Sequence, residues 1–260
     1  MVKVAGIIGH NFSGSTLLSW ILGSHPEIGA LGETHHMMTG RNYENTMARY
    51  EGRKVGCYFH GEHCPIFPHD EIPYNASDVH RVAADRMGVS IVSDESKLVD
   101  SFQRYEAARS ADEYAYIVLF KEPAGFVHSF KKRHAGLESD RPVAILSQLY
   151  SGSYGMANRF AQGKPHLFLH YDALCSDVAG TMQKLGDLLE VDPAGFAPDR
   201  YWESDFHPSG GNTQVCVNKA PIELRRPWDN DPPEMDKLSQ QVMGRAFEGL
   251  LLLADRGVQR

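Results

Sequence analysis

The chain has 260 residues and a mass of 29.0 kDa, a length that favours one large domain. Hydrophobic residues make up 42% and charged residues 23%, which is typical of globular proteins, so the composition excludes a disordered or fibrous chain. The formal net charge of -7 and the pI near 6.0 argue against a general nucleic-acid-binding protein.

The cysteines and the apolar stretches indicate the compartment. Of the four cysteines only Cys57 and Cys64 are close in sequence, and a chain of this size needs no disulfides, so a reducing compartment is the simpler interpretation. No window approaches the roughly 18 apolar residues of a membrane span, and the apolar core at the start is too short for a signal peptide. We therefore expect a cytoplasmic protein whose partners include neither a membrane nor nucleic acid.

The first 22 residues predict a strand, a glycine-bounded turn and a helix. Residues 2–8 are an apolar, β-branched run, residues 9–14 are polar and bounded by glycine, and residues 15–22 place leucine and isoleucine on one helical face. The free N–H groups of such a turn and the positive end of the helix dipole converge on one point. The segment therefore predicts a cradle for an anion.

Downstream, strands alternate with helices. Residues 34–54 predict a helix interrupted near Gly40, and residues 53–73 predict a loop rich in Gly, Pro, His and Cys. The remaining patterns predict strands at 89–92, 116–120 and 166–170, and helices at 77–87, from about 98 to 109, and at 124–134, 143–161, 171–189 and 233–256. Four strands in this order predict an α/β fold, a three-layer parallel sheet with helices on both faces that is like the P-loop nucleotide kinases.

Ligands of such sheets bind beyond the carboxyl ends of the strands. The glycine turn, residues 93–97, residues 121–129 and Tyr171 are all expected at that edge. The turn itself, Gly9-x4-Gly14-Ser15-Thr16, is the P-loop pattern with serine in place of its lysine. That lysine contacts the outer phosphates of a triphosphate, so its absence disfavours an ordinary ATPase or kinase. A glycine-bounded turn of no special function is the alternative.

The segment also resembles the donor-binding loop of the sulfotransferases that use 3'-phosphoadenosine 5'-phosphosulfate (PAPS). The matching runs are Ser13-Gly14-Ser15-Thr16-Leu17-Leu18, Ser24-His25-Pro26-Glu27-Ile28 and Gly32-Glu33. The resemblance implies that the donor is bound by the turn residues Asn11, Phe12, Ser13, Gly14, Ser15 and Thr16. The chain departs from the family at one position: where the family has Arg or Lys before the Ser-Gly, this chain has the uncharged Phe12.

A second anion site is expected at the end of the third predicted strand. Lys121 ends that strand, Ser129 lies eight residues on, and Arg133 follows on the same helical face. Two cations and a hydroxyl directed at one point can clamp a phosphate. The family has Arg-x7-Ser at this place, which holds the 3'-phosphate of PAPS, so here lysine replaces arginine. The alternative is a solvated basic helix face, because residues 131–133 read KKR.

Two later segments add weaker similarity. Tyr171 begins a run similar to the family's strand-end Tyr-Glu-x-Leu, whose tyrosine lies near the adenine, although it could also simply close a helix start beside the core. Gly211 and Asn212 resemble a Gly-Asn segment that folds over the donor in many bacterial members. Glycine-rich loops are common, so this second match is the less specific one.

The resemblance also implies the chemistry. Glu33 matches a catalytic Glu of the family and is the candidate general base, for which a partly buried carboxylate with a raised pKa would suit neutral pH. A glutamate that only stabilises a helix N-terminus is the alternative. His10, Lys97 or Lys121 could replace the cation missing at Phe12; we favour Lys97, because its run Asp-Glu-Ser-Lys resembles the family's Asp-x-Ser-Lys.

Metal binding is not expected. Residues Cys57, His60, His63 and Cys64 could ligate a metal, but their spacing fits no common zinc site, and the family often has a loop ending in Cys-Pro here. We expect a single domain over residues 1–260, with acceptor-side loops at 34–75 and 201–232.

The leading hypothesis is a PAPS-dependent sulfotransferase that releases adenosine 3',5'-bisphosphate (PAP) and acts on a hydroxyl of a small molecule or glycan. A divergent P-loop kinase is one alternative, and it would need a triphosphate and Mg²⁺. A non-catalytic scaffold that binds PAPS or PAP is the other; Phe12 supports it, whereas Glu33 and Lys97 argue against it.

Overall fold

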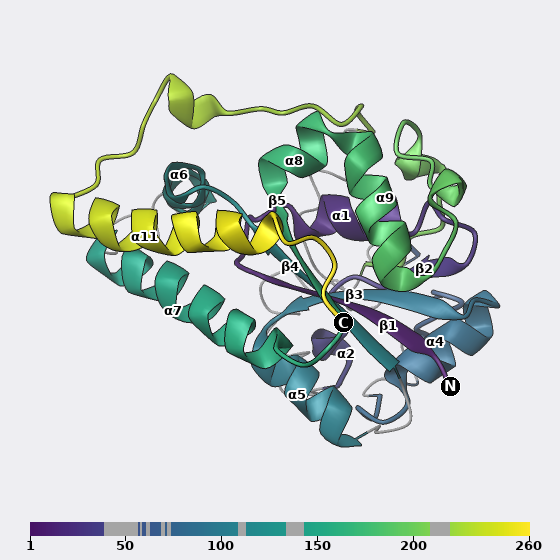
Figure 1. The fold of residues 1–260 in the computed structure, drawn as a ribbon. Helices are drawn as coiled ribbons and strands as arrows, with labels where there is room; N and C mark the ends of the chain where they lie inside the picture. The colour runs from purple at the N-terminus through teal and green to yellow at the C-terminus, as the bar shows by residue number, and fades with distance from the viewer. Residues whose placement is uncertain are drawn as a thin grey trace.

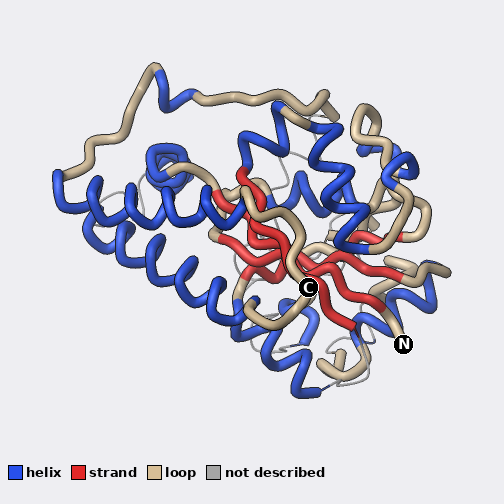
Figure 2. Tube along the Cα trace, in the orientation of Figure 1, coloured by secondary structure: helices blue, strands red, loops and turns tan. Residues whose placement is uncertain are grey.

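The computed structural model describes residues 1–38, 57, 59–60, 63–68, 71, 74–108, 113–133, 143–208 and 219–260, with only the backbone of Arg133. Its centre is a parallel sheet in the order β2-β3-β1-β4-β5 (Figures 1 and 2). The strands are β1 (Lys3–Gly9), β2 (Ile28–Ala30), β3 (Ile91–Lys97), β4 (Glu113–Phe120) and β5 (His166–His170).

Helices cover both faces of the sheet, which confirms the predicted three-layer α/β fold. One face carries α1 (Ser15–Leu22), α8 (Tyr171–Ser176) and α9 (Val178–Leu189). The other face carries α2 (His35–Met38), α4 (Val79–Met87), α5 (Val99–Ala108), α6 (Pro123–Arg133), α7 (Val143–Ala161) and α11 (Lys237–Ala254). Short 3-10 turns lie at η2 (Pro193–Gly195), η3 (Tyr201–Glu203) and η4 (Pro227–Asp229). Helices α7 and α11 lie side by side (Figure 1).

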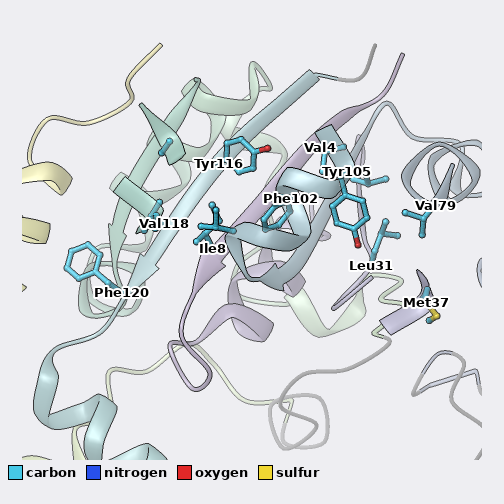
Figure 3. Close-up of a cluster of buried hydrophobic side chains, with 14 of the residues drawn as sticks. Val4, Ile8, Leu31, Met37, Val79, Phe102, Tyr105, Tyr116, Val118 and Phe120 are labelled. Carbon is cyan, nitrogen blue, oxygen red and sulfur yellow. The ribbon is translucent and has the colours of Figure 1, made fainter. Parts of the chain in front are cut away.

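The alternation of side chains along the strands divides the core into two clusters. In β1, Val4 and Ile8 face α5 and α7, whereas Ala5 and Ile7 face α1. Figure 3 shows the first cluster, in which rings from α5 pack on the sheet beside Ile8 and the side chains of β4. Because β1 and β4 are buried on both faces, their sequences are continuous apolar runs rather than alternating ones.

Several predicted elements differ from the observed ones; β4 begins three residues earlier and α11 four residues later than predicted. Strand β2 was missed, because a strand of three residues gives no pattern. Strand β3 extends to Lys97, so residues 93–97, which were expected beyond a strand ending at 92, lie within it. The helix predicted over 171–189 is two helices, because the Asp177 carboxylate caps α9 by accepting a hydrogen bond from Gly180 N at 3.0 Å. The interruption expected near Gly40 lies outside the described residues.

The carboxyl ends of the strands meet at one edge. Ile8 pairs with Lys97, Gly9 with Leu119, and the end of β4 with the end of β5. The turn after β1 therefore lies between the ends of β3 and β4, which confirms the expected convergence. Among the described helices, none has the length and apolar character that a membrane crossing would need.

Candidate active site

The turn after β1 has the geometry of an anion cradle. Phe12 and Gly14 both have left-handed backbone, with φ of 70° and 99°. Ser13 N donates to His10 O at 3.2 Å, and α1 begins at Ser15. The first N–H groups of a helix have no intrahelical partner, and they point toward the turn. Within the described part of the chain, the buried hydroxyl of Ser13 also has no hydrogen-bond partner.

Tyr171 closes one side of this turn. A Cβ atom placed on Gly14 would lie 2.5 Å from the Tyr171 ring, so only glycine allows the ring to pack against the turn. The ring also lies under the Lys121 ammonium, whose Nζ is 4.1 Å from its centroid. Tyr171 thus connects the turn to the end of β4.

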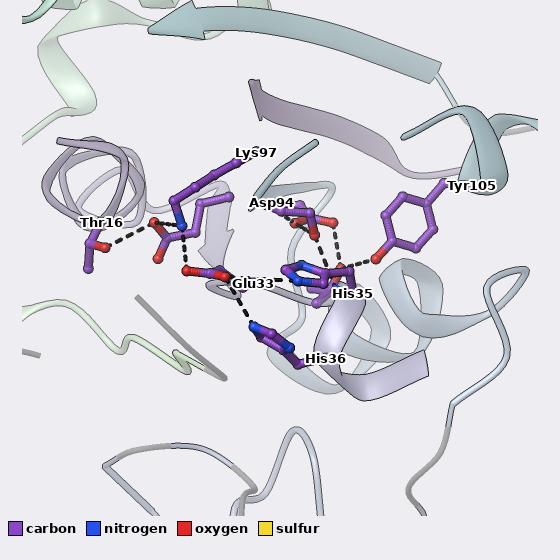
Figure 4. Close-up of polar contacts among 10 residues, drawn as sticks. Thr16, Glu33, His35, His36, Asp94, Lys97 and Tyr105 are labelled. Atoms are coloured by element: carbon purple, nitrogen blue, oxygen red, sulfur yellow. Dashed lines mark hydrogen bonds and ion pairs between the residues drawn. The ribbon is translucent and has the colours of Figure 1, made fainter. Parts of the chain in front are cut away.

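Glu33 and Lys97 form a buried ion pair at the end of β3 (Figure 4). Lys97 Nζ donates to Glu33 Oε1 and lies 3.7 Å from Glu95 Oε2. The other Glu33 oxygen lies 3.1 Å from His36 Nε2 and 4.0 Å from His35 Nε2. The two residues that the sequence proposed for catalysis are therefore in direct contact.

The electrostatics of Glu33 differ from the expectation. Burial raises the pKa of the Glu33 carboxyl, but Lys97 and His36 outweigh burial and hold that pKa below its ordinary value. The raised pKa expected for a general base is wrong for this paired state. Burial lowers the pKa of Lys97, but Glu33 and Glu95 outweigh it and leave it raised, so both partners are charged at neutral pH.

Glu95 links this pair to the turn. Thr16 Oγ1 donates to Glu95 Oε2 at 3.0 Å, and the carboxyl is fully buried. Burial raises the Glu95 pKa to about 7, in spite of the opposing Lys97. Among the described residues, its second oxygen has no hydrogen-bond partner. Glu95 is therefore a group whose charge can change near neutral pH.

Asp94 and Ser96 fix the segment that carries Glu33. Thr34 Oγ1 donates to Asp94 at 2.5 Å, His80 Nε2 lies 2.8 Å from the same oxygen, and Ser96 N and Oγ donate to the other. The Ser96 hydroxyl in turn accepts from His35 N at 3.1 Å. Because Thr34 and His35, the two residues that follow Glu33, are held in this way, the Glu33 carboxylate is directed at Lys97 (Figure 4).

A second cation lies at the end of β4. Lys121 is 8% exposed, and in the described part of the chain its ammonium makes no ion pair, but it contacts the rings of Tyr171 and Trp228. Burial lowers the Lys121 pKa to about 8. Glu122 beside it is bound instead by Arg226, at 2.6 Å, and by the Trp228 indole. The segment that contains η4 therefore covers Lys121.

The other residues predicted for this clamp are less defined. Ser129 is half-buried on α6, and the structure records no contact of its hydroxyl with Lys121 in the described region. Arg133 ends α6, and its side chain lies outside what the structure describes. Gly211 and Asn212 also lie outside the described residues.

His10 lies within the turn but is not placed as a cation. Its Nε2 is 3.0 Å from Leu149 O, and its ring packs against Phe126, Tyr150 and Tyr154. Burial lowers the His10 pKa to about 4, so the ring is neutral at pH 7. It attaches the turn to α7.

Comparisons with known proteins agree with this geometry. No family model matches the sequence, and no curated protein matches it. Among solved structures, the chain matches the sulfotransferase domain of the Synechococcus PCC 7002 olefin synthase with a TM-score of 0.70, 18% identity, and coverage of 95% of this chain and 94% of that one. The chain has the sulfotransferase fold.

Two further solved structures share this fold. The sulfotransferase domain from the curacin biosynthetic pathway matches with a TM-score of 0.58 and 16% identity, over 94% of this chain and 97% of that one. A mouse sulfotransferase complexed with PAP matches with a TM-score of 0.51 and 12% identity, over 98% and 86%.

On this sulfotransferase fold, a small pocket adjoins the ion pair. It has a volume of about 100 Å³ and lies between the turn, the end of β3 and helix α7, with Asn11, Lys97, Ser153 and Met156 in its wall. Helix α7 therefore faces the end of β3 across this pocket.

Sequence reasoning did not foresee three contacts of this site. His36 contacts Glu33, Glu95 contacts Thr16, and Trp228 covers Lys121. The run 94–97 resembles a family motif and so pointed to Glu95, but a glutamate between an aspartate and a serine is equally typical of a solvent-exposed loop. Glu33, His35 and His36 place three potential ligand atoms within 4.8 Å of one another, but the Lys97 ammonium on the same carboxylate disfavours a metal ion there.

Proposed function

We propose that the protein transfers a sulfuryl group from PAPS to a hydroxyl of a small molecule or glycan, with Glu33 as the general base. The observation that carries this proposal is the buried Glu33–Lys97 pair, which Glu95 joins to Thr16 of the anion-binding turn. It sets a proton acceptor and a cation beside the place where a bound anionic group would lie.

The residues present fit an adenine nucleotide with phosphates at both ends. The turn offers one phosphate its main-chain N–H groups and the Ser13 hydroxyl, which has no hydrogen-bond partner among the described residues. Lys121 offers a second phosphate a buried ammonium without a carboxylate partner among the described residues, about where the 3'-phosphate is expected. Lys121 and Tyr171 together favour a nucleotide donor over a lone sulfate or phosphate ion.

The bound donor would supply the activated sulfuryl group; this chain's residues supply position and charge. A negative group on the turn attracts the Lys97 ammonium and weakens its hold on Glu33. Because burial raises the Glu33 pKa and Lys97 lowers it, partial loss of Lys97 makes Glu33 a stronger base. Glu33 then accepts the hydroxyl proton, while Lys97 stabilises the charge that develops near the turn.

The acceptor hydroxyl is proposed to enter through the pocket beside Lys97. Its wall combines the polar Asn11 and Ser153 with Met156 of α7, which suits a small, partly apolar alcohol. Residues 34–75 and 201–232 remain our proposal for the loops that select this acceptor.

The two alternatives make different demands. In P-loop kinases the hydroxyl equivalent to Thr16 binds Mg²⁺. Here Thr16 donates to Glu95, and the turn has no lysine, so a kinase is disfavoured. A scaffold that only binds the nucleotide would explain Phe12, but it gives no role to a buried pair of Glu33 with Lys97.

Two measurements test the proposal. Calorimetry should show that PAP binds without Mg²⁺ and that ATP, with or without Mg²⁺, binds much more weakly; a preference for MgATP would support the kinase. Label from [³⁵S]PAPS should then appear on members of a panel of alcohols, phenols and sugars. Tight PAP binding with no transfer to any class in the panel would favour the scaffold.

A further inference from the structure

Four side chains from two distant segments converge beside the β2 edge. Cys57, His60, Cys64 and His207 each offer one ligand atom, and these four atoms lie within 4.8 Å of one another. The sequence grouped His63 with the first three, because it is near them in the chain. The structure instead brings His207 across from the segment after η3, 143 residues from Cys64.

The two histidines have the orientation of metal ligands. His60 Nδ1 lies 3.2 Å from Cys57 Sγ, and His207 Nδ1 lies 3.3 Å from Cys64 Sγ. Asp205 lies near the other nitrogen of each ring, at Nε2 to carboxylate distances of 3.9 Å for His60 and 3.0 Å for His207. A carboxylate behind the second nitrogen is the usual support of a metal-bound histidine, because it fixes which nitrogen is free to ligate.

Three of the four side chains are also shielded from solvent. Cys57, Cys64 and His207 are at most 2% exposed, and His60 is stacked on His207 with ring centroids 4.7 Å apart. Phe67 N donates to Cys64 Sγ at 3.3 Å, a contact that stabilises a thiolate. Neither cysteine forms a disulfide.

We propose that Cys57, His60, Cys64 and His207 bind one Zn²⁺ ion in a structural Cys2His2 site. Zinc bonds of about 2.3 Å to sulfur and about 2.0 Å to nitrogen place tetrahedral ligands about 3.5 Å apart, close to the two sulfur–nitrogen distances observed. Two thiolates with two imidazoles suit zinc, and four protein ligands leave no position open for a substrate.

The ion would join two segments that flank the candidate active site. His207 N donates to Ala30 O at 3.0 Å, which attaches the segment to the end of β2. Phe206 stacks on Trp20 of α1, with ring centroids 5.3 Å apart, and Trp20 also contacts Phe59. The zinc site would therefore hold Cys57, His60 and Cys64, together with residues 205–207, near the helix that begins at the anion-binding turn. The proposal does not depend on the reaction that the protein performs.

Metal content tests the site directly. Full-length protein with no affinity tag, grown with zinc, should contain one equivalent of Zn²⁺ by elemental analysis. Replacement by Co²⁺ should give the visible bands of a tetrahedral ion and a near-ultraviolet thiolate charge-transfer band. Cys64→Ser and His207→Ala should each lose the metal and these bands, whereas His63→Ala and Cys175→Ser should keep both. Asp205→Asn should weaken zinc binding about 10- to 100-fold.

A folding defect can be separated from lost ligation. His60 is exposed enough to tolerate His60→Ala, which should fold and yet lack the tetrahedral cobalt spectrum. A chelator should lower the melting temperature of the parent protein and of His63→Ala, but not that of His60→Ala. A parent protein with well under one equivalent of zinc after growth in zinc, a Cys57–Cys64 disulfide in its intact mass, or equal metal in His60→Ala and His63→Ala would each overturn the proposal.

Discussion

Replacing Glu33 by Gln is the most direct test of the proposed base. The amide keeps an oxygen that can accept from Lys97, but it cannot take a proton. Positioned general bases contribute about 10²- to 10⁴-fold to rate, which corresponds to about 3–5 kcal/mol of transition-state stabilisation. We therefore expect the turnover number to fall by about 10²- to 10⁴-fold in Glu33→Gln.

The same change should leave the fold and the donor site largely intact. Lys97 loses a charge-assisted hydrogen bond, worth about 1.5–3 kcal/mol, but it keeps Glu95 at 3.7 Å, which is an ion-pair partner whenever that carboxyl is ionised. For a domain of this size each kcal/mol lowers the melting temperature by about 2–4 °C. An assay at 20 °C therefore compares folded proteins. PAP contacts the turn and Lys121 in our proposal, so its affinity should change only a few-fold.

The assay is [³⁵S]sulfate transfer to the best acceptor of the panel, with PAP affinity measured by calorimetry on the same preparation. Glu27→Gln is the matched control, because Glu27 is an exposed glutamate six residues earlier and should behave as the parent protein. A turnover number in Glu33→Gln within three-fold of the parent value would refute the assignment. A loss of PAP affinity as large as the loss of rate would show that Glu33 acts in binding rather than in proton transfer.

Three further outcomes are expected. Lys121→Ala should weaken PAP binding about 10- to 100-fold and change AMP binding little. Replacement of the exposed Lys132 by Ala is the control, and an equal loss of affinity for both nucleotides would show that Lys121 does not bind the 3'-phosphate. Burial raises the pKa of the Glu95 carboxyl from 4.5 to about 7. The neutral carboxyl therefore stabilises the fold fully below pH 4.5, and this stabilisation is lost as the pH rises through 7 and the group ionises. Glu95→Gln should therefore be about 3 kcal/mol more stable than the parent at pH 8 and similar at pH 4.5 by urea unfolding, whereas a pH-independent difference would contradict this. Gly14→Ala should lower the free energy of unfolding by about 2–5 kcal/mol, because position 14 has a positive φ and the added Cβ meets the Tyr171 ring. The double variant Gly14→Ala, Tyr171→Ala should recover part of this loss. An unchanged free energy of unfolding in the single variant would contradict the contact.

Much of the fold was predictable because its signals are local. The helix at 15–22, the helix at 143–161 and the strand at 166–170 have the bounds that their apolar patterns predicted. The convergence of the turn with the ends of β3, β4 and β5 also followed, because parallel strands place their carboxyl ends at one edge. These inferences need only residues that are neighbours in the chain.

The contacts that decide the electrostatics are not local. Glu33 and Lys97 are 64 residues apart, and the pattern proposed each one without indicating that they pair. The expectation of a raised Glu33 pKa considered burial alone, and the ion pair reverses its sign. His207 likewise escaped notice, because nothing within reach of it in the sequence has metal-ligand spacing. Only the register of β2 against β3 and the return of residues 205–207 bring such groups together.

In our proposal, Lys97 on the neighbouring strand β3 replaces the charge that the family has at the position of Phe12. Phe12 turns its ring toward Phe130 of α6, so the turn carries no cation of its own on this side. Ile8, four residues before Phe12, pairs with Lys97 in the register of β1 with β3. The left-handed backbone of Lys97 marks the point where β3 leaves the sheet. Burying a cation that is already paired with Glu33 before the donor binds costs less free energy than burying a cation without a partner. In the proposed reaction, the same lysine controls the base and meets the charge on the donor, which a cation at position 12 could not do unless it also reached Glu33.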